Sequence, residues 1–169
     1  LASYEAPEAS NYYKPVDGVL YNKNRTVLYR YPAKRTGYEF TIPESVTEIR
    51  GQAFKNCISL EKVNIPKKLE YLGGGAFYNC GKIKEVVLPD TLTYLGGEAF
   101  YNATSLGSIR LSENLSEIRG NTFENCYSLR SIKIPDKVTR IGGHAFYGNR
   151  SLYIVEISPN SNLKEIGSS

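Results

Sequence analysis

IPESVTEIRGQAFKNCISLEKVN, residues 42–64, is the first of five 23-residue copies that follow one another without an insertion over residues 42–156. A sixth copy opens at Ile157. The aliphatic residue that opens each of the other full copies recurs at Ile65, Leu88, Leu111 and Ile134. A fixed period of this length is typical of solenoids, in which each unit is too small to form its own core and buries its apolar side against its neighbours. The sequence therefore predicts a linear stack of coils around one continuous core.

Eight positions of the repeat carry apolar side chains in nearly every copy, and we expect them to face this core. In the first copy they are Ile42, Val46, Ile49, Ala53, Phe54, Cys57, Leu60 and Val63. One of these offsets holds phenylalanine in every copy, at Phe54, Phe77, Phe100, Phe123 and Phe146. We therefore predict a single column of five phenylalanine rings along the stack.

Short strands and turns are predicted within each copy. Residues 63–65, 86–88, 109–111 and 132–134 alternate between inward and outward positions, as strands do, and stacking them predicts a parallel sheet. Proline follows the aliphatic residue that opens four of the five copies, at Pro43, Pro66, Pro89 and Pro135, and ends the ladder because it has no N–H; Ser112 is the exception. The Ala-Phe-x-Asn step is too short for a helix and is expected to form a single helical turn. Its asparagines are expected to cap exposed backbone groups, at Asn56, Asn79, Asn102 and Asn125.

A glycine occupies one column three residues before each phenylalanine. It recurs at Gly51, Gly74, Gly97, Gly120 and Gly143. This predicts either a positive φ or a neighbouring backbone too close for a Cβ, and the sequence leaves both alternatives open.

The two ends differ from the regular copies. Residues 19–21 and 27–29 flank a polar turn at 22–25 and predict a β-hairpin that caps the first coil. We therefore divide the chain into an extended segment (1–13), a hairpin capping unit (14–41) and the repeats (42–169). At the other end Ile157, Leu163 and Ile166 continue the pattern, but no further Ala-Phe step follows. We expect a truncated array whose native protein continues, or else an end covered by a partner.

Composition excludes several classes of protein. The chain of 169 residues is 41% hydrophobic with a net charge of +4, and it has no run of five like charges typical of a nucleic-acid-binding arm. No apolar stretch approaches 18 residues, so membrane insertion is not expected. The chain begins with leucine and contains no methionine, which is typical of a processed or truncated piece.

Three cysteines lie at one offset of the repeat, at Cys57, Cys80 and Cys126. A Cys57–Cys80 disulfide or a metal site are the functional alternatives, but small buried hydrophobes in a stacked column are the favoured interpretation. His144 is the sole histidine, so we expect neither a zinc site nor a cofactor.

Two surfaces are candidates for binding. The outward face of the predicted strands carries a small basic focus with apolar neighbours, and we expect it to contact an acidic or mixed protein surface through Val87, Arg110, Arg130, Lys133 and Tyr153. The alternative is that this face is simply exposed to solvent and binds nothing. Aligned tyrosines form the second candidate, either as a platform for sugar rings or as structural cross-coil pairs: Tyr71 with Tyr94, and Tyr78 with Tyr101.

The repeats resemble the BspA-like leucine-rich repeats, whose unit is close to IPxxVxxIGxxAFxxCxxLxxV, over residues 15–167. Residues 17–33, DGVLYNKNRTVLYRYPA, are similar to the hairpin that often precedes such arrays. The chain departs from the unit at Ala103, Ser112, Thr122 and Asn149. The resemblance implies a leucine-rich-repeat superhelix in a secreted or cell-surface protein of bacteria or protozoan parasites, one involved in adhesion. It carries over no ligand-contacting residue.

An enzyme is not expected, because a nucleophile, a base and an orienting group do not converge in this pattern. Asp90 and Asp136 each follow a repeat proline, which is a turn position. We therefore expect a non-catalytic, extracellular or cell-surface domain that binds a host, matrix or other surface protein. The alternatives are a carbohydrate-binding or substrate-targeting module of a larger extracellular enzyme, and a structural spacer.

Overall fold

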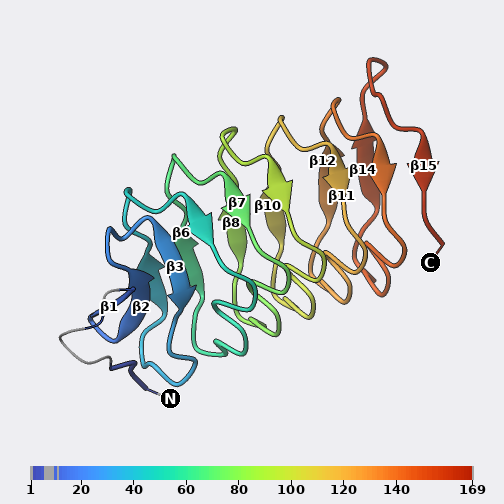
Figure 1. The fold of residues 1–169 in the computed structure, drawn as a ribbon. Coiled ribbons are helices and arrows are strands. Elements are labelled where there is room, and N and C mark those ends of the chain that lie inside the picture. The colour runs from blue at the N-terminus through green and yellow to red at the C-terminus, as the bar shows by residue number, and fades with distance from the viewer. Residues whose placement is uncertain (1, 6–9, 11, 169) are drawn as a thin grey trace.

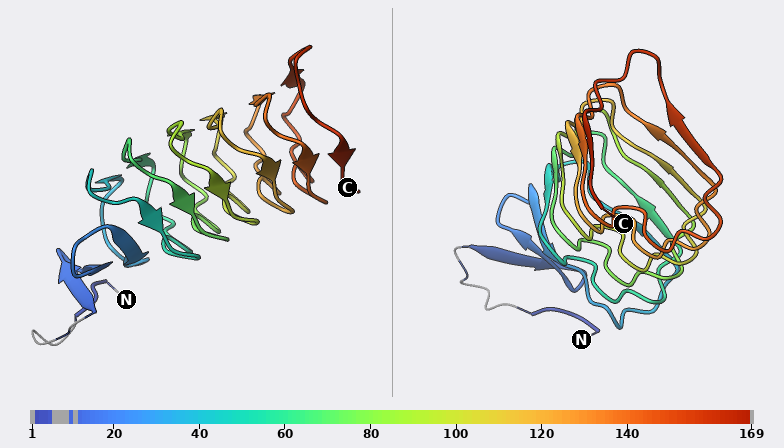
Figure 2. Two further views of the ribbon diagram at one scale, coloured as in Figure 1. Left: turned by 45° about the horizontal axis from the view of Figure 1, so that its top comes forward. Right: turned by 90° about the vertical axis from the view of Figure 1, so that its right-hand side faces the viewer.

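The computed structural model describes residues 2–5, 10 and 12–168, and it confirms the predicted solenoid. The coils follow one another from the N-terminal cap to the C-terminal end (Figure 1), and they overlap when seen along the stack in the right-hand view of Figure 2. Of the extended segment predicted for residues 1–13, residues 1, 6–9 and 11 lie outside the described part of the chain.

Each coil contributes two short strands, which lie on two sides of the stack. The first row contains the four strands predicted from the sequence, each beginning one residue earlier than predicted: β6 (Lys62–Asn64), β8 (Glu85–Val87), β10 (Ser108–Arg110) and β12 (Ser131–Ile134). β4 (Glu39–Thr41) and β14 (Ile154–Ile157) extend this row at its two ends. The second row was not predicted: β5 (Glu48–Ile49), β7 (Tyr71–Leu72), β9 (Tyr94–Leu95), β11 (Glu117–Ile118), β13 (Arg140–Ile141) and β15 (Glu165–Ile166). Pairing within each row is parallel, and partners are one repeat apart, as in Glu39↔Lys62 and Tyr71↔Tyr94.

The N-terminal hairpin pairs with the first strand of the second row. β2 (Val19–Asn22) and β3 (Val27–Arg30) pair antiparallel, and β1 (Tyr13–Val16) adds a third antiparallel strand beside β2. The Asn22 side chain organises the turn, since its Oδ1 accepts hydrogen bonds from the backbone N–H groups of Thr26 (2.8 Å) and Val27 (2.9 Å). β3 then pairs in parallel with β5, so the cap supplies the first strand edge on which the coils stack.

The predicted phenylalanine column is confirmed and extends into the cap. Neighbouring rings stack with centroids 4.8 to 5.6 Å apart and planes 6° to 17° apart. Tyr31 of the cap stacks on Phe54 at 5.1 Å and continues the column by one ring. Because the interior phenylalanines are fully buried, this column forms the centre of the core.

The predicted single helical turns are wrong, because no described residue is helical. In the first coil, i−3 hydrogen bonds from Ala53 N to Arg50 O (3.2 Å) and from Lys55 N to Gln52 O (3.1 Å) form successive β-turns. Residues with positive φ, Gln52 (59°) and Asn56 (62°), prevent this segment from continuing as a helix.

The asparagines bridge coils and do not cap the backbone as predicted. Their φ lies between 56° and 62°, a conformation that asparagine tolerates better than most residues. From the second asparagine onward, each side-chain amide donates to the Oδ1 of the preceding asparagine, giving an amide ladder of three bonds of 2.9 to 3.0 Å along Asn56, Asn79, Asn102 and Asn125.

Of the two explanations for the glycine column, close approach is confirmed and positive φ is wrong. A Cβ added to Gly51 would lie 3.1 Å from the carbonyl oxygen of Gly74, and one added to Gly97 would lie 2.9 Å from that of Gly120. Positive φ belongs to the next column, at Gln52, Gly75, Glu98, Asn121 and His144.

Candidate binding surfaces

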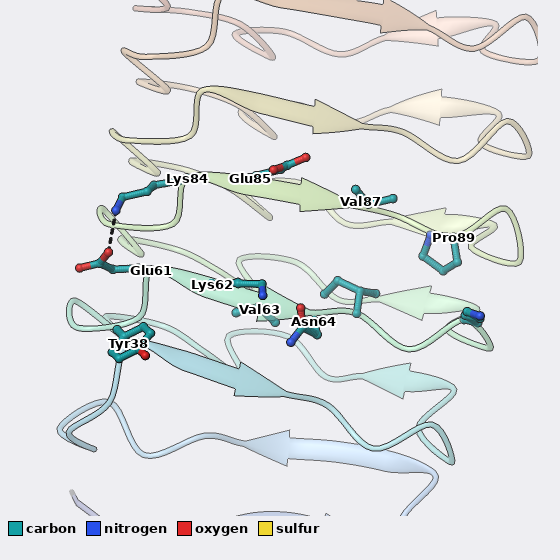
Figure 3. Close-up of a pocket in the computed structure, with 11 residues that line it drawn as sticks. Tyr38, Glu61, Lys62, Val63, Asn64, Lys84, Glu85, Val87 and Pro89 are labelled. Atoms are coloured by element: carbon teal, nitrogen blue, oxygen red, sulfur yellow. Dashed lines mark hydrogen bonds and ion pairs between the residues drawn. The ribbon is translucent and has the colours of Figure 1, made fainter.

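A groove of about 630 Å³ lies on the outer face of β6 and β8 (Figure 3). Val87 is 52% exposed in it, although its neighbour Val86 belongs to the core. Ile65 and Pro89 add apolar surface, and Tyr38 lies at the opposite end. The period-two alternation of the strands explains this placement, because it turns residues 62, 64, 85 and 87 outward. The groove therefore combines an exposed apolar centre with charged neighbours.

Ion pairs between consecutive coils fix the charged side chains beside the groove. Lys62 Nζ lies 2.8 Å from Glu39 Oε1, and Lys84 Nζ lies 2.7 Å from Glu61 Oε2 (Figure 3 shows the second pair). The hydrogen bond from Lys62 lowers the pKa of Glu39, and that from Lys84 lowers the pKa of Glu61. Lys67 and Glu85 also line the groove and form no ion pair within the described residues.

The basic focus predicted on this face is largely neutralised. Arg110 donates to both carboxylate oxygens of Asp90, at 2.9 and 2.7 Å, and to the carbonyl oxygen of Leu88 at 2.9 Å. Lys133 pairs with Glu113 at 2.9 Å. Arg130 forms no ion pair with any described residue, and Tyr153 is 73% exposed beyond it. Val87, Arg110 and Lys133 thus lie in successive first-row strands, and Arg130 is the cation among the predicted residues that has no ion pair with a described residue.

The tyrosines of the alternative platform form stacked pairs whose ring faces are largely covered. Tyr71 and Tyr94 stack at 4.4 Å, and Tyr78 and Tyr101 at 4.7 Å, with planes 6° apart in both pairs. The Arg119 guanidinium lies 4.7 Å from the Tyr94 ring centroid, and Lys55 Nζ lies 4.8 Å from that of Tyr78. A sugar ring stacks on an open aromatic face, whereas in each pair the inner faces cover one another and a cation lies over one of the two outer faces. The geometry matches the structural interpretation of cross-coil pairs.

The three thiols are free and buried in the core. Cys80 Sγ donates to the carbonyl oxygen of Phe54 at 3.0 Å, and Cys126 Sγ to that of Phe100 at 3.2 Å. Burial raises the pKa of Cys80 and raises that of Cys126 to about 12, so both side chains stay protonated and unreactive. The favoured interpretation of small buried hydrophobes therefore agrees with the structure. The described residues contain no group of three or more histidine, cysteine or acidic side chains placed to hold a metal.

The last described coil leaves apolar side chains open to solvent. Every residue of β14 is exposed, and the large apolar side chains at this end are between 42% and 67% exposed: Ile154, Val155, Ile157 and Ile166. Within the described part of the chain, no helix has the length and apolarity needed to cross a bilayer.

These features define a class of repeat protein, a two-sided β-solenoid with a stacked aromatic core and a rigid outer face. The chain belongs to the BspA-type leucine-rich-repeat family, whose model matches six copies over residues 34–153 and 117–169. No curated protein matches it at a significant level.

Solved structures of bacterial leucine-rich-repeat proteins share the fold. A leucine-rich-repeat protein of Treponema pallidum is 25% identical with a TM-score of 0.72, and the match covers 97% of this chain and 86% of that one. A leucine-rich-repeat protein of Eubacterium ventriosum is 26% identical with a TM-score of 0.61, over 94% of this chain and 54% of that one. A leucine-rich cell-surface protein of Faecalibacterium prausnitzii is 29% identical with a TM-score of 0.58, over 95% of this chain and 40% of that one. The chain thus spans about half the length of the last two.

Proposed function

We propose that this domain is a non-catalytic protein-binding module of a secreted or cell-surface protein, with a host, matrix or other surface protein as its ligand. Three of the predicted residues, Val87, Arg110 and Lys133, form the centre of the binding face, with Arg130 and Tyr153 toward the C-terminal end. The single observation that carries the proposal is the groove over β6 and β8, which is lined both by the exposed apolar side chain of Val87 and by ion-paired lysine and glutamate side chains.

This arrangement suits protein recognition. Protein interfaces commonly have an apolar centre and a polar rim, and a few central side chains carry most of the affinity. The ion pairs of this face hold long side chains in place before a partner arrives, which reduces the conformational entropy lost on binding. The cell-surface relative from Faecalibacterium prausnitzii supports an extracellular location.

Carbohydrate binding or substrate targeting is the second candidate and has less support. Its predicted site is the tyrosine platform, and the stacked rings cover one another there. A role as a structural spacer is compatible with the same fold, but it does not explain the exposed apolar surface in the groove.

The test is a binding assay on a panel of immobilised extracellular matrix proteins. We expect saturable binding to at least one of them, weakened at least about tenfold by Val87→Asp, because an unpaired charge is then buried at the centre of the interface. Thr93→Asp, an exposed substitution beside the second row of strands, is the matched control and is expected to bind as the unsubstituted domain does. The pair Arg110→Glu and Lys133→Glu tests the rest of the face. Equal affinity of all variants for a bound protein would reject this face as the site.

A further inference from the structure

Both rows of strands are interrupted at the same junction, between the third coil (residues 88–110) and the fourth (111–133). On the N-terminal side the sheets are β1-β2-β3-β5-β7-β9 and β4-β6-β8-β10. On the C-terminal side they are β11-β13-β15 and β12-β14. Each of the other full junctions is bridged by hydrogen-bonded strands in both rows. The loss of strand pairing is therefore specific to this junction, and its cause should be a residue that distinguishes this junction from the others.

The residue that directly follows each strand of the second row shows where the ladder fails. We call these six positions the post-strand column: Arg50, Gly73, Gly96, Arg119, Gly142 and Gly167. Five of their backbone N–H groups donate to the preceding coil or to the cap, with bonds of 2.7 to 2.9 Å. Among the described residues, the N–H of Arg119 has no such bond to the third coil.

The Cβ of Arg119 explains the gap. A Cβ added to Gly73, Gly96, Gly142 or Gly167 would lie closer than the 3.0 Å that real Cβ atoms respect, against the backbone nitrogen of the preceding coil's glycine. Glycine at these positions is what allows two coils to approach within hydrogen-bonding distance. Arg119 carries a Cβ at the same place, so the fourth coil cannot approach the third as closely. Arg50 also has a Cβ, but it packs on the cap and not on a regular coil, and its N–H donates to Leu28 O at 2.9 Å.

Other contacts hold the junction together at its corners. On the turn side the backbone bonds persist, from Glu98 N to Gly120 O (3.2 Å) and from Phe100 N to Thr122 O (2.9 Å). At the corner after the first-row strands the links come from side chains, Ser112 Oγ to Leu92 O (2.6 Å) and Asn114 Nδ2 to Asp90 O (2.7 Å). The strand ladders are thus lost while the corners stay attached.

We propose that this junction is a built-in seam, at which the solenoid opens locally as two blocks that are joined at the turn edge. The Cβ of Arg119 creates the seam by keeping the strands of coils three and four out of hydrogen-bonding range. Regions with fewer backbone hydrogen bonds open at lower free energy than their neighbours, so the seam is the first interior place where the stack separates.

Amide hydrogen exchange resolved to single residues tests the proposal. In the unsubstituted domain we expect the amide of residue 119 to exchange at least about tenfold faster than those of Gly96 and Gly142. Arg119→Gly is expected to slow the exchange at residue 119 at least about tenfold, because the ladder can then close. Arg119→Ala keeps the Cβ and removes the guanidinium, so we expect exchange there to stay fast. Arg50→Gly is the matched control and should leave exchange at residue 119 unchanged.

A reciprocal variant tests the same cause at another junction. Gly96→Ala is expected to open a second seam between coils two and three and to speed exchange at residue 96 at least about tenfold. Gly107→Ala is its control in the same coil, because an added Cβ there meets only ordinary contacts at 3.8 and 3.9 Å. Equal protection of residues 96 and 119 in the unsubstituted domain would overturn the seam. Slow exchange in Arg119→Ala, or fast exchange in Arg119→Gly, would overturn its assignment to the Cβ.

Discussion

Tyr71 and Tyr94 stack in adjacent coils with ring centroids 4.4 Å apart and planes 6° apart. Arg119 from the following coil lies over the Tyr94 ring at 4.7 Å, so this contact continues across the junction at which the strand ladder stops. Both tyrosines are partly buried, and burial raises the pKa of Tyr71, with a further contribution from Tyr94. These tyrosines therefore connect three successive coils on the outside of the second row of strands.

Tyr94→Ala is expected to lower the free energy of unfolding by about 2 kcal/mol, because it removes both the aromatic pair and the cation–π contact. Urea unfolding followed by circular dichroism measures the loss. Tyr12→Ala is the control, since Tyr12 is 77% exposed, and its effect should stay within about 0.5 kcal/mol. A neutral effect of Tyr94→Ala on stability, together with loss of polysaccharide binding, would instead support a sugar platform.

Phe100→Ala is expected to cost about 3 to 5 kcal/mol, because Phe100 is fully buried between two stacked rings and its removal leaves a cavity. Phe146→Ala, at the end of the column, should cost clearly less, since Phe146 is only partly buried and stacks on one ring. Thermal and urea unfolding of both variants check this order. Equal losses would mean that the column does not act as a continuous core.

Acid is expected to destabilise the domain through its inter-coil ion pairs. Hydrogen bonds from Arg110, Lys62 and Lys84 lower the pKa values of Asp90, Glu39 and Glu61 respectively. A carboxyl group whose pKa is lower in the folded chain stabilises it at pH values above the unfolded pKa, and this contribution is lost as the pH falls through the folded pKa. The melting temperature should therefore fall progressively below about pH 5, where unfolded carboxyl groups begin to protonate.

Asp90→Asn isolates one of these pairs. The variant should show a shallower dependence of melting temperature on pH, because it no longer releases a proton at that position on folding. Added salt should reduce the difference between the two proteins at neutral pH, since the Asp90–Arg110 pair is solvent-exposed. Identical pH profiles would show that Asp90 does not contribute.

The three thiols are expected to resist a thiol-specific reagent in the native domain at pH 8. Each is buried, and burial raises the pKa values of Cys80 and Cys126, so access requires unfolding. Titration should give three reactive thiols in denaturant and almost none without it. Ser151→Cys, at an exposed position, is the positive control and should add one thiol that reacts at once. Rapid native reaction of any of the three cysteines would contradict their place in the core.

The core was predictable because every copy repeats its apolar offsets. Phe54 and Phe77 are 23 residues apart, so the repeat period alone predicts that their rings are neighbours in the stack, as the structure shows. The second row of strands did not follow in the same way. Strands of two residues, such as Glu48–Ile49, are too short to display a period of two, and they form only because the adjacent coil presents matching backbone groups.

The charge balance of the candidate face was harder to predict for a geometric reason. Lys62 and Lys84 pair with carboxylates one full repeat earlier, which an alignment of the copies displays. Arg110 and Lys133 pair with Asp90 and Glu113, which lie 20 residues earlier, in the loop after the preceding strand. An alignment of the copies places these cations and carboxylates in different columns. The sequence therefore does not show that the two cations form ion pairs, which depends on the conformation of the loop.

The uniform register of the coils has a consequence for the length of the array. Neighbouring coils meet through the same columns of side chains, although the strand ladders are interrupted between the third and fourth coils. The cap contacts the first coil through β3 and Tyr31. Removing or duplicating one whole unit, such as residues 65–87, recreates interfaces that the molecule already contains. Such a protein can grow or shrink in steps of 23 residues, and an added unit with glycine after its second-row strand can keep the strand ladder that is interrupted at Arg119.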